Sequence, residues 1–325
     1  MTKKTKILIA VGVPAIIVLA LAIFLLVWFL GERYPAFDAS ARAEVQLEGL
    51  DEGFVPQGLC ALPEGGYAVS GYMKDKSSSR VYFLGTGETK YITVRQGDKV
   101  LTSHFGGVAA TKEYLYLTSG NKIVRVPLAQ ALASENKGAV AVADDFDAGF
   151  GLAFCQIWNG YLVVGEFYRP GNYETDASHH VTVGGETNPA LVYCYELDEA
   201  APGGGGALCC VLSVRGLVQG IAFTEENIYL SCSWGLADSE ICVYANPIAG
   251  GASDAQYEVN GVSVPLYFFG GERQLACEKL PSMTEGIFAE GDRLYVLFES
   301  ACQKYKSFVR RQMKFVTSVP LDMFK

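Results

Sequence analysis

The sequence of 325 residues has few basic side chains: 26 Lys and Arg stand against 35 Asp and Glu, which gives a formal net charge of −9. Proteins that bind duplex nucleic acid use a basic face to neutralise phosphates, so we expect no nucleic-acid partner. Methionine is also scarce, with five copies, whereas there are 36 glycines and 12% of the residues are aromatic. This composition favours sheets and tight turns over a helical bundle.

The sequence also lacks the common signatures of catalytic and metal sites. It contains no GxSxG, no HExxH, no phosphate-binding Walker loop and no CxxC. Its nine cysteines lie mostly in apolar, strand-like segments, where cysteine behaves as a small buried hydrophobe. A mostly thiol-bearing chain outside the cell suits a reducing habitat. Cys232 and Cys242 flank the turn SWGLADSE and form the one pair that we single out as a candidate disulfide.

Residues 7–30 form a run of 24 residues without a formal charge. A helix rises about 1.5 Å per residue and the hydrocarbon core of a bilayer is about 30 Å thick, so this run is long enough to cross it. Lys3, Lys4 and Lys6 precede the run, and the positive-inside rule places that end in the cytoplasm. The alternatives are a buried core helix, which would show a polar face, and a cleaved signal peptide, whose apolar region is shorter.

These features predict a single-pass protein of the cell membrane that is anchored in the bilayer through residues 7–30. We expect a short basic cytoplasmic tail over residues 1–6, a transmembrane signal-anchor helix over 7–30 and a linker over 31–42. Residues 43–325 then form an extracytoplasmic domain.

From Phe54 onward, one pattern recurs: a turn ending in Gly, a strand, a second turn, and a strand richer in aromatic residues. Its copies begin at Gly58, Gly107, about Ala153, Gly220 and Gly286. Units of about 40–50 residues with four short strands each are typical of β-propeller blades. We therefore predict an all-β propeller of five blades, or of six if residues 255–275 contain a further blade.

The fifth unit lacks an outer strand, and the segment AEVQLEGL at residues 43–50 is the candidate to supply it, which would close the ring. Insertions are expected at residues 170–189, 200–207 and 246–254. After the uncharged run at residues 7–30, the only stretch expected to form a helical turn is PLAQALAS, at residues 127–134.

Propeller geometry predicts which side chains share one end of the disc. The loop leading into an inner strand and the loop between the second and third strands lie at the same end, so their residues converge on one mouth of the central channel. We expect three candidate catalytic residues there: His104, Glu285 and Glu166. The candidate ligand-binding residues are Gln57, Tyr72, Lys74, Tyr168, Arg169, Gln219, Trp234 and Glu299.

Other roles for these residues remain open at this point. Gln57 and Gln219 also suit hydrogen bonds between neighbouring blades. Lys74, Arg169 and Lys304 would form a positive collar for an anionic ligand. His179 and His180 lie in the long insertion, where adjacent histidines are more often solvated, but they would form part of a lid if that insertion folds over the mouth.

The inner-strand openings PQGL, GGVA, QGIA and EGIF resemble those of the secreted β-propeller superfamily, which includes NHL-repeat, gluconolactonase-like and streptogramin-lyase-like proteins. The resemblance spans about residues 43–320 as a repeat pattern and implies the fold. The metal-dependent lactonases of that group begin an inner strand with a Glu ligand, which Glu285 would match, with Gln57 and Gln219 as amide counterparts. The resemblance thus implies Ca²⁺ or Mg²⁺ as a candidate cofactor, although the other inner-strand openings carry no clear Asn or Asp ligand.

Three functions follow from these patterns. The first is binding of a small-molecule or glycan ligand at the channel mouth. The second is a hydrolase or lyase that acts on a lactone, ester or glycan, with His104 or Glu285 as general base. The third is a cell-envelope interaction scaffold. A cavity whose carboxyl pKa values are perturbed would favour the enzyme over simple binding.

Overall fold

A computed structural model describes residues 3–30, 33–248 and 250–325, and the side chains of residues 3–12 and 27–30 lie outside its description. The chain divides into two compact units, Met1–Ala39 and Ser40–Lys325. The first unit contains α1 (Lys3–Leu30) and begins α2 (Pro35–Ser40). The predicted membrane span begins and ends among side chains outside the description. Within the part that is described, no helix has both the length and the apolar character that a membrane span requires.

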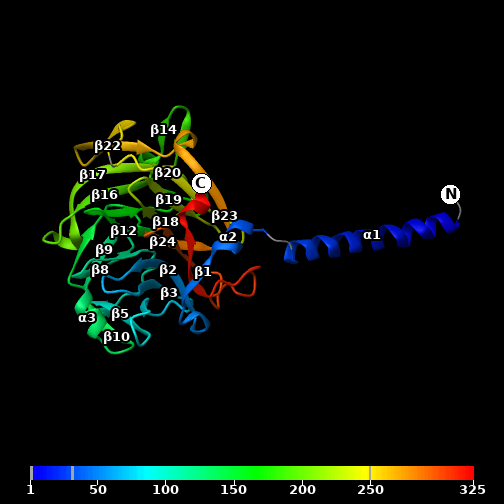
Figure 1. Ribbon diagram of the computed structural model, residues 1–325, viewed down its shortest axis with the longest axis horizontal. Coiled ribbons are helices and arrows are strands. Elements are labelled where there is room, and N and C mark those ends of the chain that lie inside the picture. Colours follow the sequence, from blue (N-terminus) through cyan, green and yellow to red (C-terminus); the bar gives the residue numbers. More distant parts are fainter. Residues whose placement is uncertain (1–2, 31–32, 249) are drawn as a thin grey trace. The chain divides into compact units, whose positions relative to one another are not determined.

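The second unit is an all-β propeller of five blades, which confirms the five-unit interpretation of the sequence. Each blade is built on four antiparallel strands. Each inner strand contacts the inner strands of the two adjacent blades, so the five form a closed ring near the middle of the propeller (Figure 1). These inner strands are β2 (Phe54–Ala61), β7 (Val108–Ala110), β12 (Phe154–Trp158), β18 (Val218–Phe223) and β24 (Thr284–Glu290).

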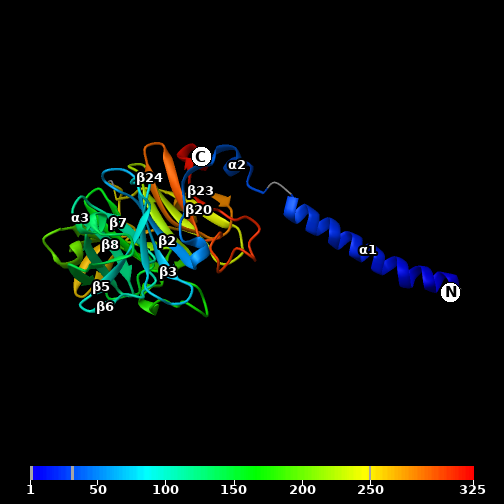
Figure 2. The same ribbon diagram turned by 90° about the horizontal axis from the view of Figure 1, so that it is seen from below.

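The first two blades follow the predicted order of strands. After β2, the first blade continues with β3 (Tyr67–Met73), β4 (Arg80–Leu84) and β5 (Lys90–Gln96), and β6 (Lys99–Val100) and β10 (Gly138–Ala141) extend it by pairing with β5. After β7, the second contains β8 (Tyr114–Ser119), β9 (Lys122–Pro127) and β11 (Asp144–Asp147). The expected helical turn is α3 (Leu128–Ala133), which lies at the rim against β8 and β9 (Figure 2).

A segment between two strands of the fourth blade joins the sheet of the third blade. The third blade contains β12, β13 (Tyr161–Gly165), β16 (Ala190–Leu197) and β17 (Gly205–Val214), and the fourth contains β18, β19 (Asn227–Cys232), β20 (Ser239–Ala245) and β23 (Gln274–Leu280). Between β20 and β23 the chain crosses to the third blade, where β22 (Val262–Phe268) pairs in parallel with β17 and β21 (Ala255–Val259) forms the edge. Residues 255–268 therefore extend the third blade, and the six-blade alternative is wrong.

The fifth blade closes the ring in the predicted way. Its strands are β24, β25 (Arg293–Phe298), β26 (Phe315–Pro320) and, at the outer edge, β1 (Arg42–Gln46). β1 pairs antiparallel with β26, so residues near the start of the propeller complete the sheet formed by its C-terminal residues. The short 3-10 helices are η1 (Leu50–Glu52), η2 (Ala177–His179), η3 (Pro202–Gly204), η4 (Gly271–Arg273) and η5 (Leu321–Phe324).

Close packing of the inner strands explains the glycine in the repeated openings. A Cβ atom on Gly58 would lie 2.6 Å from the backbone nitrogen of Val108 in the next blade. A Cβ atom on Gly286 would lie 2.7 Å from the backbone nitrogen of Leu59. Neither distance accommodates a methyl group, so glycine permits the neighbouring backbones to approach around the channel.

The core consists of apolar clusters between adjacent blades. One of these clusters, between the third and fourth blades, contains five of the nine cysteines: Cys194, Cys210, Cys232 and Cys242 are buried, and Cys277 packs against them. The disulfide joins Cys242 to Cys277, and Cys232 is a free thiol, so the predicted pairing of Cys232 with Cys242 is wrong. Cys277 lies directly opposite Cys242 on β23, a strand that the turn SWGLADSE does not include.

Candidate functional site

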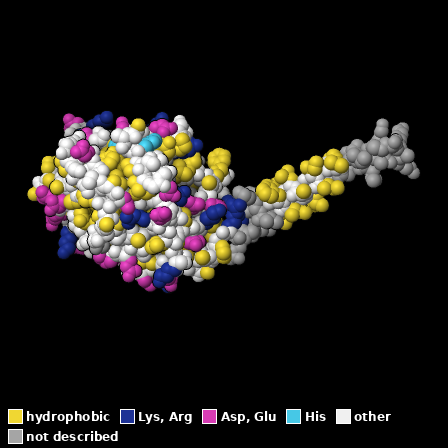
Figure 3. All heavy atoms as spheres, turned by 90° about the horizontal axis from the view of Figure 1, so that it is seen from above, with side chains coloured by type: hydrophobic (Ala, Val, Ile, Leu, Met, Phe, Trp, Pro, Cys, Tyr) yellow, Lys and Arg dark blue, Asp and Glu magenta, His cyan; other side chains and the backbone are white. Residues whose placement is uncertain are grey.

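A cavity of about 940 Å³ opens at the end of the propeller where the inner strands begin, and all five blades contribute to its wall. Eight of the eleven predicted site residues line it: Gln57, Tyr72, His104, Glu166, Gln219, Trp234, Glu285 and Glu299. These residues lie far apart in the sequence. His104, Glu166, Trp234 and Glu299 reach this mouth from loops, as the repeat pattern predicts. Gln57, Tyr72, Gln219 and Glu285 lie instead within strands, near the strand ends that face the mouth. Acidic side chains are scattered over the face drawn in Figure 3, in keeping with the net charge.

Two carboxyl groups of the fifth blade form the centre of one side of this cavity. Glu285 belongs to β24 and Glu299 directly follows β25, and their side chains are hydrogen-bonded to each other. Burial raises the pKa of Glu285 well above its usual range, and the neighbouring charge of Glu299 adds to this effect. Burial also raises the pKa of Glu299 to about 7, although Lys304 and Gln57 oppose the shift. The pair therefore holds a proton at acidic pH and exchanges one near neutrality.

A hydrogen-bonded chain connects this pair to the second blade. Gln57 donates from Nε2 to Glu299 Oε2 over 2.9 Å, and its Oε1 lies 2.6 Å from His104 Nε2. Because the amide oxygen accepts, His104 Nε2 carries the proton and its Nδ1 is left as an acceptor when the ring is neutral. Protein surrounds the imidazole where it does not face the cavity. This burial, with the charge of Lys304, lowers the pKa of His104 to about 4.

The hydrogen bonds of Gln57 and Gln219 show how these two predicted residues contribute to the cavity. Gln219 donates from Nε2 to Glu285 Oε1 over 3.4 Å, and Gln57 contacts Glu299. Both amides thus reach from their own blades to the carboxyl groups of the fifth blade. They hold the pair in position and also present polar groups to the cavity.

One lysine supplies positive charge beside the carboxyl pair. Lys304 Nζ donates to the Tyr72 hydroxyl over 2.6 Å and lies 4.7 Å from the centre of the Tyr305 ring. Tyr72 also packs against His104, with ring centroids 4.3 Å apart. Burial raises the pKa of Tyr72 and of Tyr305, so both hydroxyl groups remain protonated and able to donate hydrogen bonds.

The opposite wall contains a carboxylate–imidazole pair. Glu166 directly follows β13, and its Oε1 accepts a hydrogen bond from the backbone of Leu191 over 2.8 Å. His179 Nδ1 lies 3.0 Å from each of its carboxylate oxygens. Burial of the imidazole opposes its charged form, but the hydrogen bond and charge of Glu166 outweigh this, and the pKa of His179 is raised.

His179 belongs to the insertion at residues 170–189, which contains η2 and the hairpin of β14 (Val181–Val183) and β15 (Glu186–Asn188). This insertion lines part of the cavity with Tyr173, Thr175 and Asp176. Tyr257 of β21 donates from its hydroxyl to the Ser178 carbonyl over 3.0 Å. The segment that crosses from the fourth blade therefore supports the insertion at the cavity.

Three predicted site residues lie outside the cavity wall. Lys74 is exposed and contacts Gln303, and Tyr168 and Arg169 line a separate groove of about 500 Å³. The Arg169 guanidinium stacks over the Trp234 ring at 4.2 Å. The predicted positive collar is therefore divided, because among Lys74, Arg169 and Lys304 only Lys304 belongs to the wall.

The sequence-based selection missed several residues of the wall. His179 was not selected as a site residue, although a position over the mouth was the alternative to a solvated one. Its proximity to Glu166 arises from the fold of an irregular insertion that has no periodic signal. Lys304, which was expected in the positive collar, and Tyr305 were not missed, because they follow Glu299 in a loop that the sequence already assigned to this mouth. Phe150 and Phe167 add aromatic surface.

The chemistry of this wall partly fits a divalent cation. Glu285 and Glu299 offer carboxylate oxygens, which Ca²⁺ and Mg²⁺ prefer, whereas Gln57 and Gln219 direct their amide nitrogens at these carboxyl groups. Such a cation would replace the proton that the pair holds. Within the described part of the chain, the one set of three side chains whose donor atoms converge closely is Glu240, Cys242 and Cys277, which lies outside the cavity wall.

No family model matches the chain, and no curated protein matches its sequence. Several solved structures resemble it at the level of the fold. The glutaminyl cyclase of Myxococcus xanthus is 12% identical, with 86% of this chain and 94% of that one covered at a TM-score of 0.45. The WD40 propeller domain of Doa1 is 11% identical, with 85% and 88% covered at 0.40. These likenesses concern the propeller fold alone.

Proposed function

We propose that this chain is a membrane-anchored extracytoplasmic propeller that binds a small polar molecule, or the end of a glycan, in the cavity at the channel mouth. The observation that carries the proposal is the cavity itself. Its volume of about 940 Å³ falls in the usual range of small-molecule sites, roughly 300–1,000 Å³. Aromatic surface and a few convergent polar groups are the usual composition of such sites.

The anchoring part of the proposal is supported by the sequence. The uncharged run of 24 residues at 7–30 and the three lysines before it favour a helix across the bilayer with the N-terminus in the cytoplasm. Protease treatment of intact cells that express the full chain tests this topology. Digestion of the propeller from outside is the expected result, and protection until the cells are lysed would contradict it.

Ligand binding is tested with the full chain purified in detergent. Thermal unfolding is measured against panels of lactones, carboxylic esters and oligosaccharides. At least one compound should raise the melting temperature of the wild type and lose its effect in Trp234→Ala and Gln219→Ala. Glu290→Gln, at the far end of β24, is the matched control and should respond like the wild type. The binding proposal fails if no compound acts, or if the hits act equally on the two cavity variants.

A second function, acid–base catalysis on a lactone or ester, is favoured by the contact between Glu285 and Glu299. Two carboxyl groups that share a proton provide one acid and one base at the same pH. In this pair Glu299 accepts hydrogen bonds from Gln57 and Glu285, so it is the base, and Glu285 is the acid. The Lys304 ammonium and the Tyr72 hydroxyl would stabilise negative charge on a reacting oxygen.

The geometry of the pair also narrows the substrate class. Glycosidases that use two carboxyl groups hold them roughly 5–9.5 Å apart, across the scissile bond. Because Glu285 and Glu299 are in direct hydrogen-bonding contact, this pair does not fit that role. A carbonyl substrate, attacked by a water molecule that the carboxylate activates, fits it better.

Hydrolysis of the lactone and ester panel tests this second function. Glu299→Gln should lower any turnover by about 100-fold or more, since general base catalysis contributes roughly 10²–10⁴-fold. Glu290→Gln should leave it unchanged. EDTA treatment followed by Ca²⁺ or Mg²⁺ separates a proton-sharing pair from a metal site. Loss of activity with EDTA and recovery with the cation would assign the pair to a cation.

A further inference from the structure

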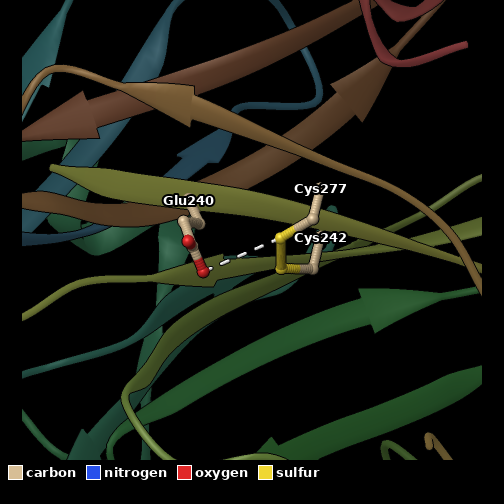
Figure 4. A group of neighbouring side chains, drawn as sticks. All are labelled: Glu240, Cys242 and Cys277. Atoms are coloured by element: carbon tan, nitrogen blue, oxygen red, sulfur yellow. Dashed lines mark hydrogen bonds between the residues drawn. A yellow bond between two sulfur atoms is a disulfide. The ribbon is translucent and has the colours of Figure 1, made fainter. Parts of the chain in front are cut away.

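The disulfide between Cys242 and Cys277 lies in the fourth blade, outside the cavity wall (Figure 4). Cys242 belongs to β20 and Cys277 to β23, the outermost strand of that blade. The two sulfur atoms differ in their surroundings. Cys242 is fully buried, whereas Cys277 is partly exposed. An attacking thiol from solvent can therefore reach Cys277 first.

A cation is held against the buried sulfur. Arg215 follows β17 and its Nη1 lies 3.0 Å from Cys242 Sγ and 3.9 Å from Cys277 Sγ. The same nitrogen is 3.2 Å from Glu240 Oε2, which fixes the guanidinium in place. A thiolate formed on Cys242 would thus be paired at once with a positive charge, and a neighbouring arginine lowers the pKa of a thiol.

Glu240 differentiates the two sulfur atoms further. Its Oε2 lies 3.7 Å from Cys277 Sγ, so a negative charge on Cys277 would face a carboxylate (Figure 4). Charge is therefore better placed on Cys242 than on Cys277. The leaving sulfur in an exchange reaction departs faster when its thiol has a lower pKa, which makes Cys242 the favoured leaving group.

The neighbouring blade contains a cysteine pair without these features. Cys194 and Cys210 lie directly opposite each other on β16 and β17, and both are buried free thiols. Their contact and their burial raise the pKa of Cys194 well above its usual range. Cys232 is also a free thiol, and burial raises its pKa to about 12, so it does not compete as a nucleophile. Cys242 and Cys277 differ from these free thiols in two ways. They are joined by a disulfide, and the charged side chains of Arg215 and Glu240 lie beside them.

We propose that Cys242 and Cys277 form a thiol–disulfide exchange site that accepts two electrons from a dithiol, either a small molecule or a dithiol protein. A thiolate of the donor attacks Cys277 Sγ, the Cys242–Cys277 bond breaks, and its electron pair remains on Cys242 beside Arg215. The donor's second thiolate then attacks the donor sulfur of the mixed disulfide and releases Cys277. The donor leaves as a disulfide, and its two protons are taken up by Cys242 and Cys277.

The test uses the full chain in detergent, with dithiothreitol as the donor and iodoacetamide to label thiols under native conditions. Intact mass should show one newly labelled thiol after reduction, and peptide mapping should place the label on the partly exposed Cys277, while the buried Cys242, Cys194 and Cys210 stay unlabelled. Arg215→Gln should slow the reduction by about tenfold, because the leaving thiolate loses its cation. Arg215→Lys should remain within about threefold of the wild type, since it keeps the charge. Arg273→Gln is the matched control, because Arg273 precedes β23 but pairs with Asp254.

Two results would overturn the proposal. The first is reduction that requires unfolding of the chain, and the second is an equal rate in the wild type and the Arg215→Gln and Arg273→Gln variants. If Arg215→Gln does not fold, the pH dependence of the thiolate absorbance of Cys242 decides instead, measured as the difference between Cys277→Ser and the double variant Cys242→Ser/Cys277→Ser. A midpoint below about pH 8.5, the usual thiol pKa, supports the site, and a higher value contradicts it. Stoichiometric Zn²⁺ binding that protects both reduced thiols would replace it with a metal site.

Discussion

Glu166 of the third blade and His179 of the insertion after it form a two-oxygen contact, with the imidazole Nδ1 at 3.0 Å from both carboxylate oxygens. Both side chains line the cavity. The contact attaches an irregular segment to the end of a strand, and the buried carboxylate has a positively charged partner when the imidazole is protonated.

This contact predicts a pH dependence of stability. The pKa of His179 is raised above the ordinary 6.5, so the folded chain binds this proton more tightly than the unfolded chain. The stability from the pair is fully present below pH 6.5 and is lost as the pH rises through the higher folded value. In His179→Gln this loss should disappear. Urea unfolding at pH 6 and pH 9 measures the difference.

His180 provides the matched control for that experiment, since it is adjacent, exposed and not bonded to Glu166. His180→Gln should keep the pH dependence of the wild type. At pH 6, His179→Ala should lower the free energy of unfolding by about 1.5–3 kcal/mol, the usual range for a hydrogen bond to a charged group. A wild-type profile in His179→Gln would refute the pairing in solution.

The pair of Glu285 and Glu299 predicts that the stability of the fold depends on pH between 4.5, the ordinary pKa of a glutamate, and about 7. Burial raises the pKa of Glu299 from 4.5 to about 7, so the folded chain retains a proton that the unfolded chain loses. The wild type should therefore lose stability as the pH rises from about 4.5 to 7. Glu299→Gln removes this titrating group and should make the decline less steep, while the buried Glu285, whose pKa is also raised, still contributes to it. A decline in Glu299→Gln as steep as in the wild type would show that the pair is not its source.

The close approach of the inner strands predicts a sharp effect of one methyl group. Gly286→Ala would place a Cβ atom 2.7 Å from the Leu59 nitrogen, and we expect a loss of about 1–3 kcal/mol in the free energy of unfolding. Gly151→Ala is the control, because nothing lies within 4 Å of its added Cβ atom. Denaturant midpoints measure both, and equal midpoints would contradict the packing argument.

Ring closure predicts where the chain can be shortened. A chain of residues 34–325 keeps β1, whereas residues 47–325 lack it and leave β26 as an open edge. At about 0.5–1.5 kcal/mol for each net hydrogen bond, loss of this strand should lower the free energy of unfolding by about 2–5 kcal/mol. The exposed edge should also promote association. Unchanged thermal unfolding and a monomeric state of the shorter chain would contradict closure by β1.

Much of the fold and part of the site could be predicted because they repeat. The strand pattern and the glycines of the repeated openings predicted five units, with six as the alternative, and the missing outer strand of the last unit pointed to residues 43–50. The rule that two loops of each blade share one end brought Gln57, Glu285 and Glu299 to one cavity. Lys74 satisfied the same rule but contacts Gln303 outside the cavity wall, because a loop position does not determine where a long side chain makes its contacts.

The sequence by itself determined the β-rich architecture, the acidic charge and the uncharged run at residues 7–30, because composition and periodicity act locally along the chain. Only the tertiary structure decided that Cys242 pairs with Cys277, that residues 255–268 extend the third blade, and that His179 meets Glu166. Each of these contacts joins segments whose spacing carries no period. Their formation depends on how insertions cross between blades, and that is set by packing in three dimensions.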